Sequence, residues 1–331
     1  MPAPLVTVLL PVYNGAETIE DAVTSVLRQT MPDFELLIVD DGSTDDTHRL
    51  LMGIDDPRLR VITHDRNLGI VASLNEGLEA ARAPLVARLD ADDRCVPDRL
   101  ALQCQRLLAS PEIGVLAGGR RKIDPRGKPL GDGFPPTTHA AIALRLLFGN
   151  CLAHPTVMFR RELVMAAGGY RQAAYPAEDY DLWLRLARQT LLEAVPQLLI
   201  EYRVTASGIS ASEFAEQRSR TLELSAGALE DRLGRAIDRR FLSSVIFGRP
   251  EGASGEGGSS RDAVDLVLAA ADSIARECRD RGIAMDGLRS ATADLLLRET
   301  VLGRGRSRFR EVARILLRDP SLVTDLLRRV P

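Results

Sequence analysis

The chain has 331 residues, of which 45% are hydrophobic, so it is long enough to form one large domain or two. Its 43 basic and 46 acidic residues give a formal net charge of −3, which argues against nucleic acid as a partner. It shows no charged-then-apolar leader and no apolar run of roughly 18 residues, so we expect a soluble or peripheral protein in the cytoplasm.

The first 90 residues alternate strand and helix patterns. Short apolar runs predict strands at residues 5–10, 34–39, 59–63 and 85–89, and helical spacing predicts helices over 17–29, from 45 and over 71–82. Strands that alternate with helices of this length indicate a mostly parallel sheet with covered faces. We therefore predict an α/β fold in which ligands bind at the carboxyl ends of the strands.

The first two predicted strands end in polar turns. Pro11, Tyr13 and Asn14 close the first strand, where exposed backbone amides could meet a nucleotide, although an ordinary turn would have the same composition. Asp40 and Asp41 close the second strand, where a carboxylate could accept a hydrogen bond from a base or a ribose hydroxyl. Capping of the next helix would explain the following Ser-Thr pair, but not two adjacent aspartates before a glycine.

Amide side chains accompany the helix that follows the third strand. Asn67 lies in the turn before this helix and Asn75 lies within it, each two residues ahead of a glycine. Loop and helix propensities alone would account for both residues.

A run of carboxylates follows the fourth strand. Asp90, Asp92 and Asp93 fall within four residues, directly after an apolar segment. Such groups repel one another unless a positive charge lies among them, and Mg²⁺ and Mn²⁺ prefer carboxylates together with phosphate oxygens. A solvated turn or a helix cap is the alternative for this pattern alone. Because both acidic turns follow strands, we expect them at the same edge of the sheet.

Only helical patterns follow residue 213. We therefore divide the chain near residue 210, into an α/β part over 1–210 and a helical region over 211–331, with a flexible linker near 248–260. The segment 307–318 is apolar on one side and basic on the other. It could lie on an anionic membrane surface, or it could pack on its own domain or on a dimer partner.

Further motifs follow in the second hundred residues. In chain order, the whole set is Pro11-Val-Tyr-Asn14, Asp40-Asp41-Gly-Ser, Asn67-x-Gly, Asn75-x-Gly, Asp90-Ala-Asp92-Asp93, His154-Pro-Thr, Gly169-Tyr170, Glu178-Asp179-Tyr-Asp181 and Tyr202-Arg203. Each motif is common, but the ordered set is specific. Over roughly residues 4–210 it resembles family 2 of the inverting glycosyltransferases, of the non-processive type that builds bacterial polysaccharide and the cell envelope. That resemblance implies the GT-A fold.

The resemblance also implies a donor site for a nucleotide-diphosphate sugar. Asp40 or Asp41 would bind the base, Asp90 would face the ribose, and Asp92 would coordinate a divalent ion, Mn²⁺ or Mg²⁺. Arg203 would clamp the diphosphate. Relatives often carry a histidine two residues after that arginine, where this chain has Thr205, so a metal ligand expected there is missing. Other residues that we place in the donor site are Pro11, Tyr13, Asn14, Asn67 and Asn75, with Asp93 as a further candidate.

Asp179 would be the general base under this resemblance. An acceptor hydroxyl is barely acidic in water, so it needs a carboxylate within hydrogen-bond reach as it attacks. Glu178 and Asp181 are the alternatives, and a helix N-terminus would also explain acidic residues here. A dipole at that terminus would lower the basicity of Asp179, which weakens its assignment.

Two aromatic residues are further candidates. His154 could contact the diphosphate, the acceptor or the metal, and a structural histidine at a strand start is the alternative. Trp183, the single tryptophan, could stack on an acceptor sugar, but its place on the apolar face of a helix favours the core.

We therefore predict a metal-dependent inverting transferase that moves one sugar to a hydroxyl of a glycan or lipid-linked acceptor. The absence of a Gln-x-x-Arg-Trp motif favours single transfers over processive synthesis. A sugar-1-phosphate nucleotidyltransferase would need a basic, glycine-rich loop after the first strand, where this chain has no lysine or arginine. A non-catalytic binding or assembly subunit with the same fold is the other alternative. Retention of both Asp92 and Asp179 argues against it.

Overall fold

A computed structural model describes residues 3–205, 213–248 and 260–301. Its contacts divide the chain into two compact units, one within Met1–Pro135 and Leu152–Gln217 and the other within Pro136–Cys151 and Arg218–Pro331. The second unit thus includes a segment from the middle of the chain as well as the C-terminal helices. The domain boundary that we expect near residue 210 stays a prediction.

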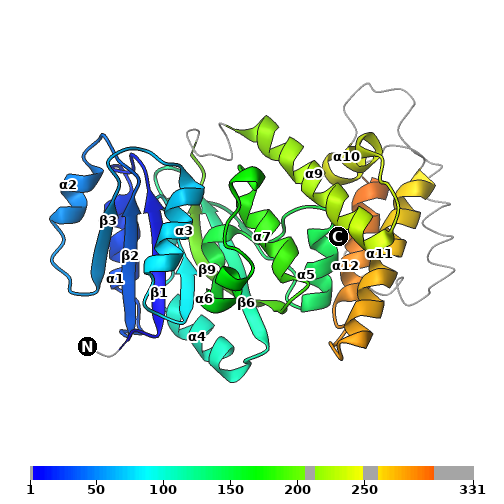
Figure 1. Cartoon of the computed structure of the whole chain (residues 1–331), viewed down its shortest axis with the longest axis horizontal. Coiled ribbons are helices and arrows are strands. Elements are labelled where there is room, and N and C mark those ends of the chain that lie inside the picture. Colours follow the sequence, from blue (N-terminus) through cyan, green and yellow to red (C-terminus); the bar gives the residue numbers. More distant parts are fainter. Residues whose placement is uncertain (1–2, 206–212, 249–259, 302–331) are drawn as a thin grey trace. The chain divides into compact units, whose positions relative to one another are not determined.

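A mixed sheet forms the centre of the first unit (Figure 1). Its strands are β1 (Val6–Val12), β2 (Phe34–Asp40), β3 (Leu59–Thr63), β4 (Leu85–Arg88), β5 (Arg94–Cys95), β6 (Ile113–Ile123), β7 (Pro129–Gly133), β8 (Met158–Arg160) and β9 (Leu191–Arg203). They lie in the order β3-β2-β1-β4-β8-β6-β9-β5, and β7 pairs with β6. The pairs β1–β2, β2–β3, β1–β4 and β6–β9 are parallel. The predicted parallel arrangement of the first four strands is confirmed.

Helices cover both faces of this sheet because successive residues of a strand point to opposite sides. The helices of this unit are α1 (Ile19–Leu27), α2 (Thr47–Met52), α3 (Ile70–Ala80), α4 (Arg99–Ala109), α6 (Arg161–Ala166) and α7 (Glu178–Leu186). Val8 and Leu10 of β1 share a buried core with Val23 of α1. On the other face, α3 packs so closely on β1 that a Cβ at Gly77 would come within 2.2 Å of the Leu9 side chain.

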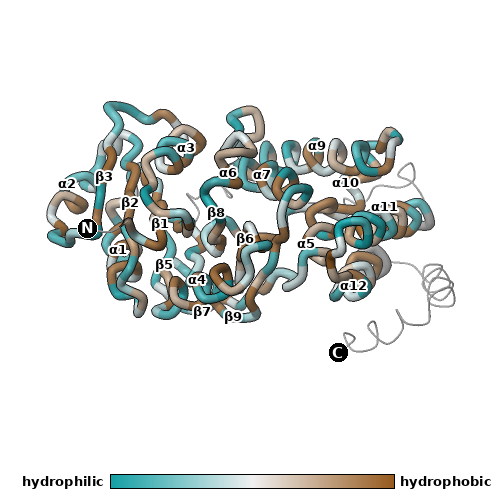
Figure 2. The backbone as a smooth tube through the Cα atoms, turned by 60° about the horizontal axis from the view of Figure 1, so that its bottom comes forward, coloured by the Kyte–Doolittle hydropathy of each residue, from teal (hydrophilic) through white to brown (hydrophobic). Residues whose placement is uncertain are grey.

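Hydropathy follows this layering. Figure 2 shows hydrophobic stretches along β1 and β2 and hydrophilic stretches in the turns that connect the elements. The strands of the parallel part are mostly apolar, and all seven residues of β1 and of β2 are buried. The accessible polar residues, which are the candidates for binding and catalysis, therefore lie in the turns at the strand ends.

Helices are the regular elements among the described residues of the second unit, and those after residue 213 agree with the sequence prediction. They are α5 (His139–Leu146), most of α9 (Phe214–Leu233), α10 (Arg239–Phe247), α11 (Ser260–Asp280) and α12 (Leu288–Val301). An ion pair of 2.6 Å between Arg145 and Asp294 joins α5 to α12. Most of the predicted linker (249–259) and the basic segment 307–318 lie outside the described residues. Within the described ranges, no helix has the length and apolar character to cross a membrane.

Candidate functional site

The carboxyl ends of four parallel strands meet at one edge of the sheet. The register places Val12 beside Asp40, Asp40 beside Thr63, and Leu9 beside Arg88. The turns that follow β1, β2, β3 and β4 therefore start close together. Of the predicted site residues, Pro11 is buried within β1, whereas Tyr13, two residues further along, is 47% exposed at this edge.

The turns after β1 and β2 hold each other in place. The Oδ1 atom of Asn14 accepts a hydrogen bond of 2.8 Å from the Thr44 amide, and the Asn14 amide donates to Ser43 Oγ over 3.0 Å. Asn14 has a positive φ of 52°, a conformation that asparagine tolerates better than most residues. The predicted residue Asn14 thus shapes the edge of the site.

Asp40 and Asp41 are both buried, and each carboxylate accepts hydrogen bonds from neighbouring groups of the protein. Asp40 accepts a hydrogen bond from the Ser43 amide (3.0 Å) and lies 3.2 Å from Nδ1 of His48. Asp41 accepts hydrogen bonds of 2.8 Å from the amides of Leu68 (Oδ1) and Gly69 (Oδ2). Both aspartates lie at the predicted edge, where they bind the protein's own turns.

The glycine after these aspartates allows two turns to touch. Gly42 has a φ of +70°, and a Cβ there would lie 2.4 Å from the backbone carbon of Arg66. Only glycine fits this close approach without strain. The turn that contains Asn67 is therefore packed against the acidic turn.

Asn67 and Asn75 have different surroundings. The Oδ1 atom of Asn67, an exposed residue, accepts a hydrogen bond of 3.0 Å from the Gly69 amide within its own turn. Asn75 makes two hydrogen bonds of 2.9 Å, one to each backbone polar group of Tyr170. Asn75 therefore joins α3 to the loop at Gly169 and Tyr170.

Asp90, Asp92 and Asp93 form a carboxylate cluster at the end of β4. Their ligand atoms lie within 4.8 Å of one another. Burial, followed by the charge of Asp90, raises the pKa of Asp92 to about 6, and the same two causes raise that of Asp93 well above its usual range. Oδ2 of Asp93 is buried without a hydrogen-bond partner among the described residues. Three crowded carboxylates with an unsatisfied buried oxygen fit a hard divalent cation.

Arg203, predicted to clamp the diphosphate, lies beneath this cluster. Its side chain is only 5% exposed. Nε donates to the backbone oxygen of Asp92 (2.9 Å), Nη1 to that of Pro125 (2.6 Å), and the Arg203 amide donates to Asp93 Oδ1 (2.8 Å). Nη2 forms an ion pair of 3.2 Å with Asp21 of α1. In this structure Arg203 thus holds the backbone of the carboxylate cluster.

Arg88 is a charged residue of the site that our sequence analysis did not select. It is the last residue of β4, it is 3% exposed, and its Nη1 lies 2.6 Å from Asp90 Oδ1 in an ion pair that is not aligned as a hydrogen bond. Its positive charge offsets part of the rise in the pKa of Asp92, Asp93 and Glu178 that burial and neighbouring carboxylates cause. The sequence signal that could have identified Arg88 was an arginine inside an otherwise apolar strand.

Replacement of Arg88 with Met should destabilise the protein by about 1–3 kcal/mol, because the partly exposed Asp90 and the buried Asp93 lose a neighbouring positive charge. Urea denaturation would measure this change. The double variant Arg88→Met/Asp90→Asn should recover part of the loss, since it removes both charges. Equal stability of Arg88→Met and wild type would contradict the role of Arg88 as counter-charge.

Glu178 and Asp179 begin α7, but their surroundings differ. Glu178 is 9% exposed, its Oε2 has no hydrogen-bond partner among the described residues, and burial followed by the charge of Asp179 raises its pKa to about 7. Asp179 is half-buried, and its Oδ1 accepts a hydrogen bond of 2.7 Å from the Tyr180 amide. Asp181, the other candidate base, is held by Arg185 in an ion pair of 2.7 Å.

His154 packs in the core against Trp183, a buried residue of α7. Nε2 of His154 lies 2.8 Å from the hydroxyl of Tyr170, and burial lowers the pKa of His154 well below its usual value. Trp183 is fully buried, with its ring edge-on to that of His154 at 5.8 Å between centroids. Neither ring lies at the surface, so in this structure both support the helix that carries Asp179.

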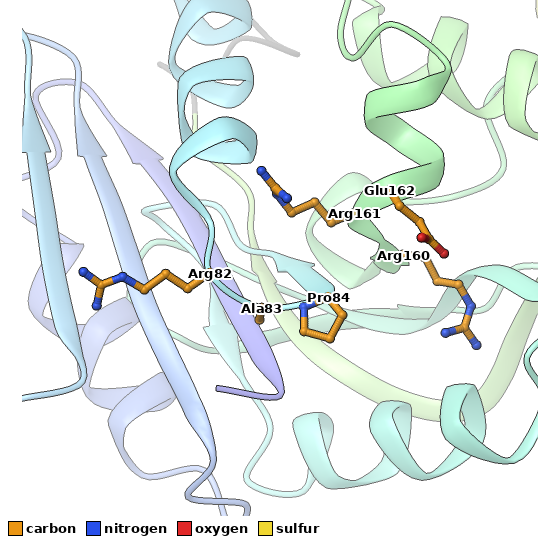
Figure 3. A pocket seen from close by; sticks show the side chains of 6 residues that line it. All are labelled: Arg82, Ala83, Pro84, Arg160, Arg161 and Glu162. Carbon is orange, nitrogen blue, oxygen red and sulfur yellow. The ribbon is translucent and has the colours of Figure 1, made fainter. Parts of the chain in front are cut away.

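A cavity of about 380 Å³ lies at the other end of β4 (Figure 3). Arg82, Ala83 and Pro84, which line it, precede β4, whereas the carboxylate cluster follows that strand. Two further lining arginines, Arg160 and Arg161, donate to backbone carbonyls at the ends of α4 and α3. This cavity is separate from the predicted site.

Comparison with known proteins links this arrangement to one family. A model described as Glycosyl transferase family 2 matches residues 7–166. The protein named Uncharacterized protein MT1568 of Mycobacterium tuberculosis is 32% identical over 231 residues, which cover 65% of this chain and 72% of that protein. The Escherichia coli protein named UDP-Glc:alpha-D-GlcNAc-diphosphoundecaprenol beta-1,3-glucosyltransferase WfgD is 29% identical over 218 residues, 64% of this chain and 82% of that protein.

A solved structure shares the fold. The mannosyltransferase PcManGT from Pyrobaculum calidifontis, in complex with GDP-Man and Mn²⁺, aligns with a TM-score of 0.55 at 20% sequence identity. The alignment covers 98% of this chain and 87% of that one. At this level of identity, the likeness concerns the fold.

Proposed function

The chain belongs to Glycosyl transferase family 2 and has the predicted GT-A fold, and we propose that it is a metal-dependent inverting glycosyltransferase. It would transfer one sugar from a nucleotide-diphosphate sugar to a hydroxyl group. The carboxylate cluster carries this proposal, because it lies at the sheet edge where the predicted nucleotide-binding turns converge. The family itself establishes a glycosyltransferase.

In this proposal the donor lies across the turns after β1, β2, β3 and β4. Asp92 would hold a divalent ion, Mn²⁺ or Mg²⁺, with Asp90 and Asp93 beside it, and Asp90 would also face the ribose. A divalent cation supplies positive charge that stabilises the leaving diphosphate without proton transfer. Tyr13, Asn14 and Asn67 border the nucleoside. Arg203 acts from below the cluster by fixing the backbone of Asp92.

Asp179 is the proposed general base. It removes the proton of the acceptor hydroxyl as that oxygen attacks the anomeric carbon from the side opposite the diphosphate, which inverts the configuration. The hydrogen bond from the Tyr180 amide fixes the orientation of its carboxylate. Glu178 is more buried, and its pKa of about 7 leaves it partly protonated near neutral pH. Its half-buried neighbour Asp179 is therefore better suited to meet an acceptor.

We further propose a glycan or a lipid-linked saccharide as the acceptor, in polysaccharide or cell-envelope synthesis. This part follows the name of the relative WfgD, which describes a diphosphoundecaprenol-linked acceptor. An acceptor of that kind lies at a membrane surface. Peripheral contact at the inner face of the membrane, through the basic segment 307–318, remains part of the proposal.

A binding screen tests the proposed function. UDP, GDP and dTDP, each with Mn²⁺ or with EDTA, would be added to the full chain in thermal unfolding and calorimetry. One diphosphate should bind with Mn²⁺ and raise the apparent stability by about 2.7 kcal/mol at a concentration of about 100 Kd. Absence of binding for every nucleotide and metal would favour the non-catalytic subunit instead.

A further inference from the structure

His64 lies between two carboxylates at the edge where the donor would bind. It follows β3, and its side chain is 6% exposed. Nδ1 lies 2.6 Å from Asp41 Oδ1, and Nε2 lies 2.6 Å from Glu76 Oε2 of α3. His64 belongs to no motif that the sequence analysis singled out, and Glu76 is the unspecified middle position of the motif Asn75-x-Gly.

Both contacts of His64 can be hydrogen bonds only if His64, Asp41 and Glu76 together carry enough protons. A neutral imidazole has one N–H donor, so its second nitrogen would face a carboxylate oxygen with a lone pair. An imidazolium donates from both nitrogens. The alternative, a protonated carboxyl group, would fall on Glu76, but that side chain is 46% exposed and therefore well solvated. The geometry thus requires a cationic His64.

Asp41 connects this cation to the turn after β3. One of its oxygens accepts from His64 and from the Leu68 amide, and the other accepts from the Gly69 amide. The same turn touches Gly42 through the backbone of Arg66. Protein donors therefore fill three of the roughly four acceptor sites of the Asp41 carboxylate, so at most one site is left for a nucleotide.

We propose that His64 is a positioning residue for the donor, whose imidazolium fixes Asp41 and the turn over residues 66–69 in the shape that receives the nucleoside. This inference rests on the proposed function, because it concerns the same donor site. Under this inference, the role of Asp41 is to form the wall of the site. The base is then left to contact that wall and Tyr13.

A pH dependence follows from this arrangement. Burial opposes protonation of His64, but the hydrogen bonds and charges of Asp41 and Glu76 outweigh it and raise the pKa of His64. These two carboxylates, one after β2 and one on α3, are the charged groups that face the ring. The contribution of the His64 contacts to folding stability is complete below about pH 6.5, which is the pKa of a histidine in the unfolded chain. This contribution is lost as the pH rises through the higher pKa that His64 has in the folded protein. Donor affinity should fall over the same range.

The first experiment measures binding of a nucleoside diphosphate with Mn²⁺ between pH 7 and pH 9, where the pH stays above the pKa of about 6 of the proposed metal ligand Asp92. Wild type should bind about tenfold more tightly at the acidic end, since the charge-assisted contacts are intact there. The variant His64→Gln should bind weakly at every pH, with little pH dependence. The matched control is His48→Gln, because His48 also contacts an aspartate of this turn but is 48% exposed. It should keep the wild-type pH dependence, and a wild-type profile in His64→Gln would overturn the inference.

A second experiment does not depend on donor binding. The chain has four histidines, so ¹⁵N spectra can be assigned with four single variants. At pH 6.5, the pKa of an ordinary histidine, the His64 ring should mostly show two N–H nitrogens, and Glu76→Gln should lower the pH at which it loses one. A neutral His64 at that pH would refute the inference even if a nucleotide binds. A cationic His64 in a protein that binds no nucleotide would instead count against the proposed function.

Discussion

The variant Asp179→Asn should turn over about 10³-fold more slowly than wild type and bind the donor with unchanged affinity. An amide has the shape of the carboxylate but cannot accept the acceptor's proton, and general base catalysis typically contributes 10²–10⁴-fold. The change leaves the carboxylate cluster after β4 untouched, so the donor site should be intact. Single-turnover rates with a saturating donor and calorimetric titration of the diphosphate would measure the two effects separately.

Glu178→Gln is the matched control for this prediction. It replaces the neighbouring carboxyl group by an amide of the same shape on the same helix. Because Glu178 is buried and its pKa lies at about 7, a neutral amide resembles the form that it partly adopts near neutral pH. We therefore expect a loss of less than tenfold in rate. If Glu178→Gln abolished turnover and Asp179→Asn did not, the general base would be Glu178.

The variant Asp92→Asn should lose metal-dependent donor binding and yet unfold at a higher temperature. Three carboxylates whose oxygens lie within 4.8 Å repel one another when no cation is bound. Removing one charge relieves that repulsion, and we expect a gain on the order of 1 kcal/mol in the free energy of unfolding. The same change removes the proposed metal ligand, so added Mn²⁺ should no longer stabilise the protein.

The exposed Asp55, in the loop before β3, provides a control of equal charge change. Asp55→Asn should leave both the stability and the response to Mn²⁺ close to wild type, since surface substitutions rarely exceed about 0.5 kcal/mol. The prediction for Asp92→Asn combines a gain in stability without metal and a loss of the stabilisation by Mn²⁺. If Asp92→Asn were less stable than wild type without metal, the cluster would be held together by hydrogen bonds and not strained by repulsion.

The sequence was sufficient for the parallel part of the fold. The predicted strands at 34–39, 59–63 and 85–89 agree with β2, β3 and β4 to within one residue at each end. Their regular apolar character made them easy to find, and parallel pairing then brought their polar ends to one edge. The closeness of the turns that carry Asp41 and Asp92 follows from that pairing alone.

The longest strand, β9, did not emerge from the pattern. It contains Pro196, and its pairing with β6 shifts register at several places. Proline and irregular pairing both weaken the alternation by which a strand is recognised. A prediction that depends on periodicity therefore stops where the sheet becomes irregular.

The sequence also could not identify residues that act through partners far away along the chain. Arg203 and Asp92 are separated by 111 positions, and His64 meets carboxylates from two other elements. No spacing rule along a chain encodes such contacts, because they are set by how the sheet and its helices pack. Arg203 was recognised as a site residue only through the resemblance, and its buried position came from the structure.

The close approach at Gly42 has a consequence for attempts to redirect the enzyme to another nucleotide sugar. Positions 41 and 42 are unsuitable for randomised libraries, since a Cβ at position 42 would meet the backbone of Arg66 and Asp41 binds two amides of the neighbouring turn. Tyr13 and Leu68 border the same edge with 47% and 48% of their surface exposed. Variation at these two positions would alter the surface that we propose a nucleoside meets and would leave the scaffold beneath it unchanged.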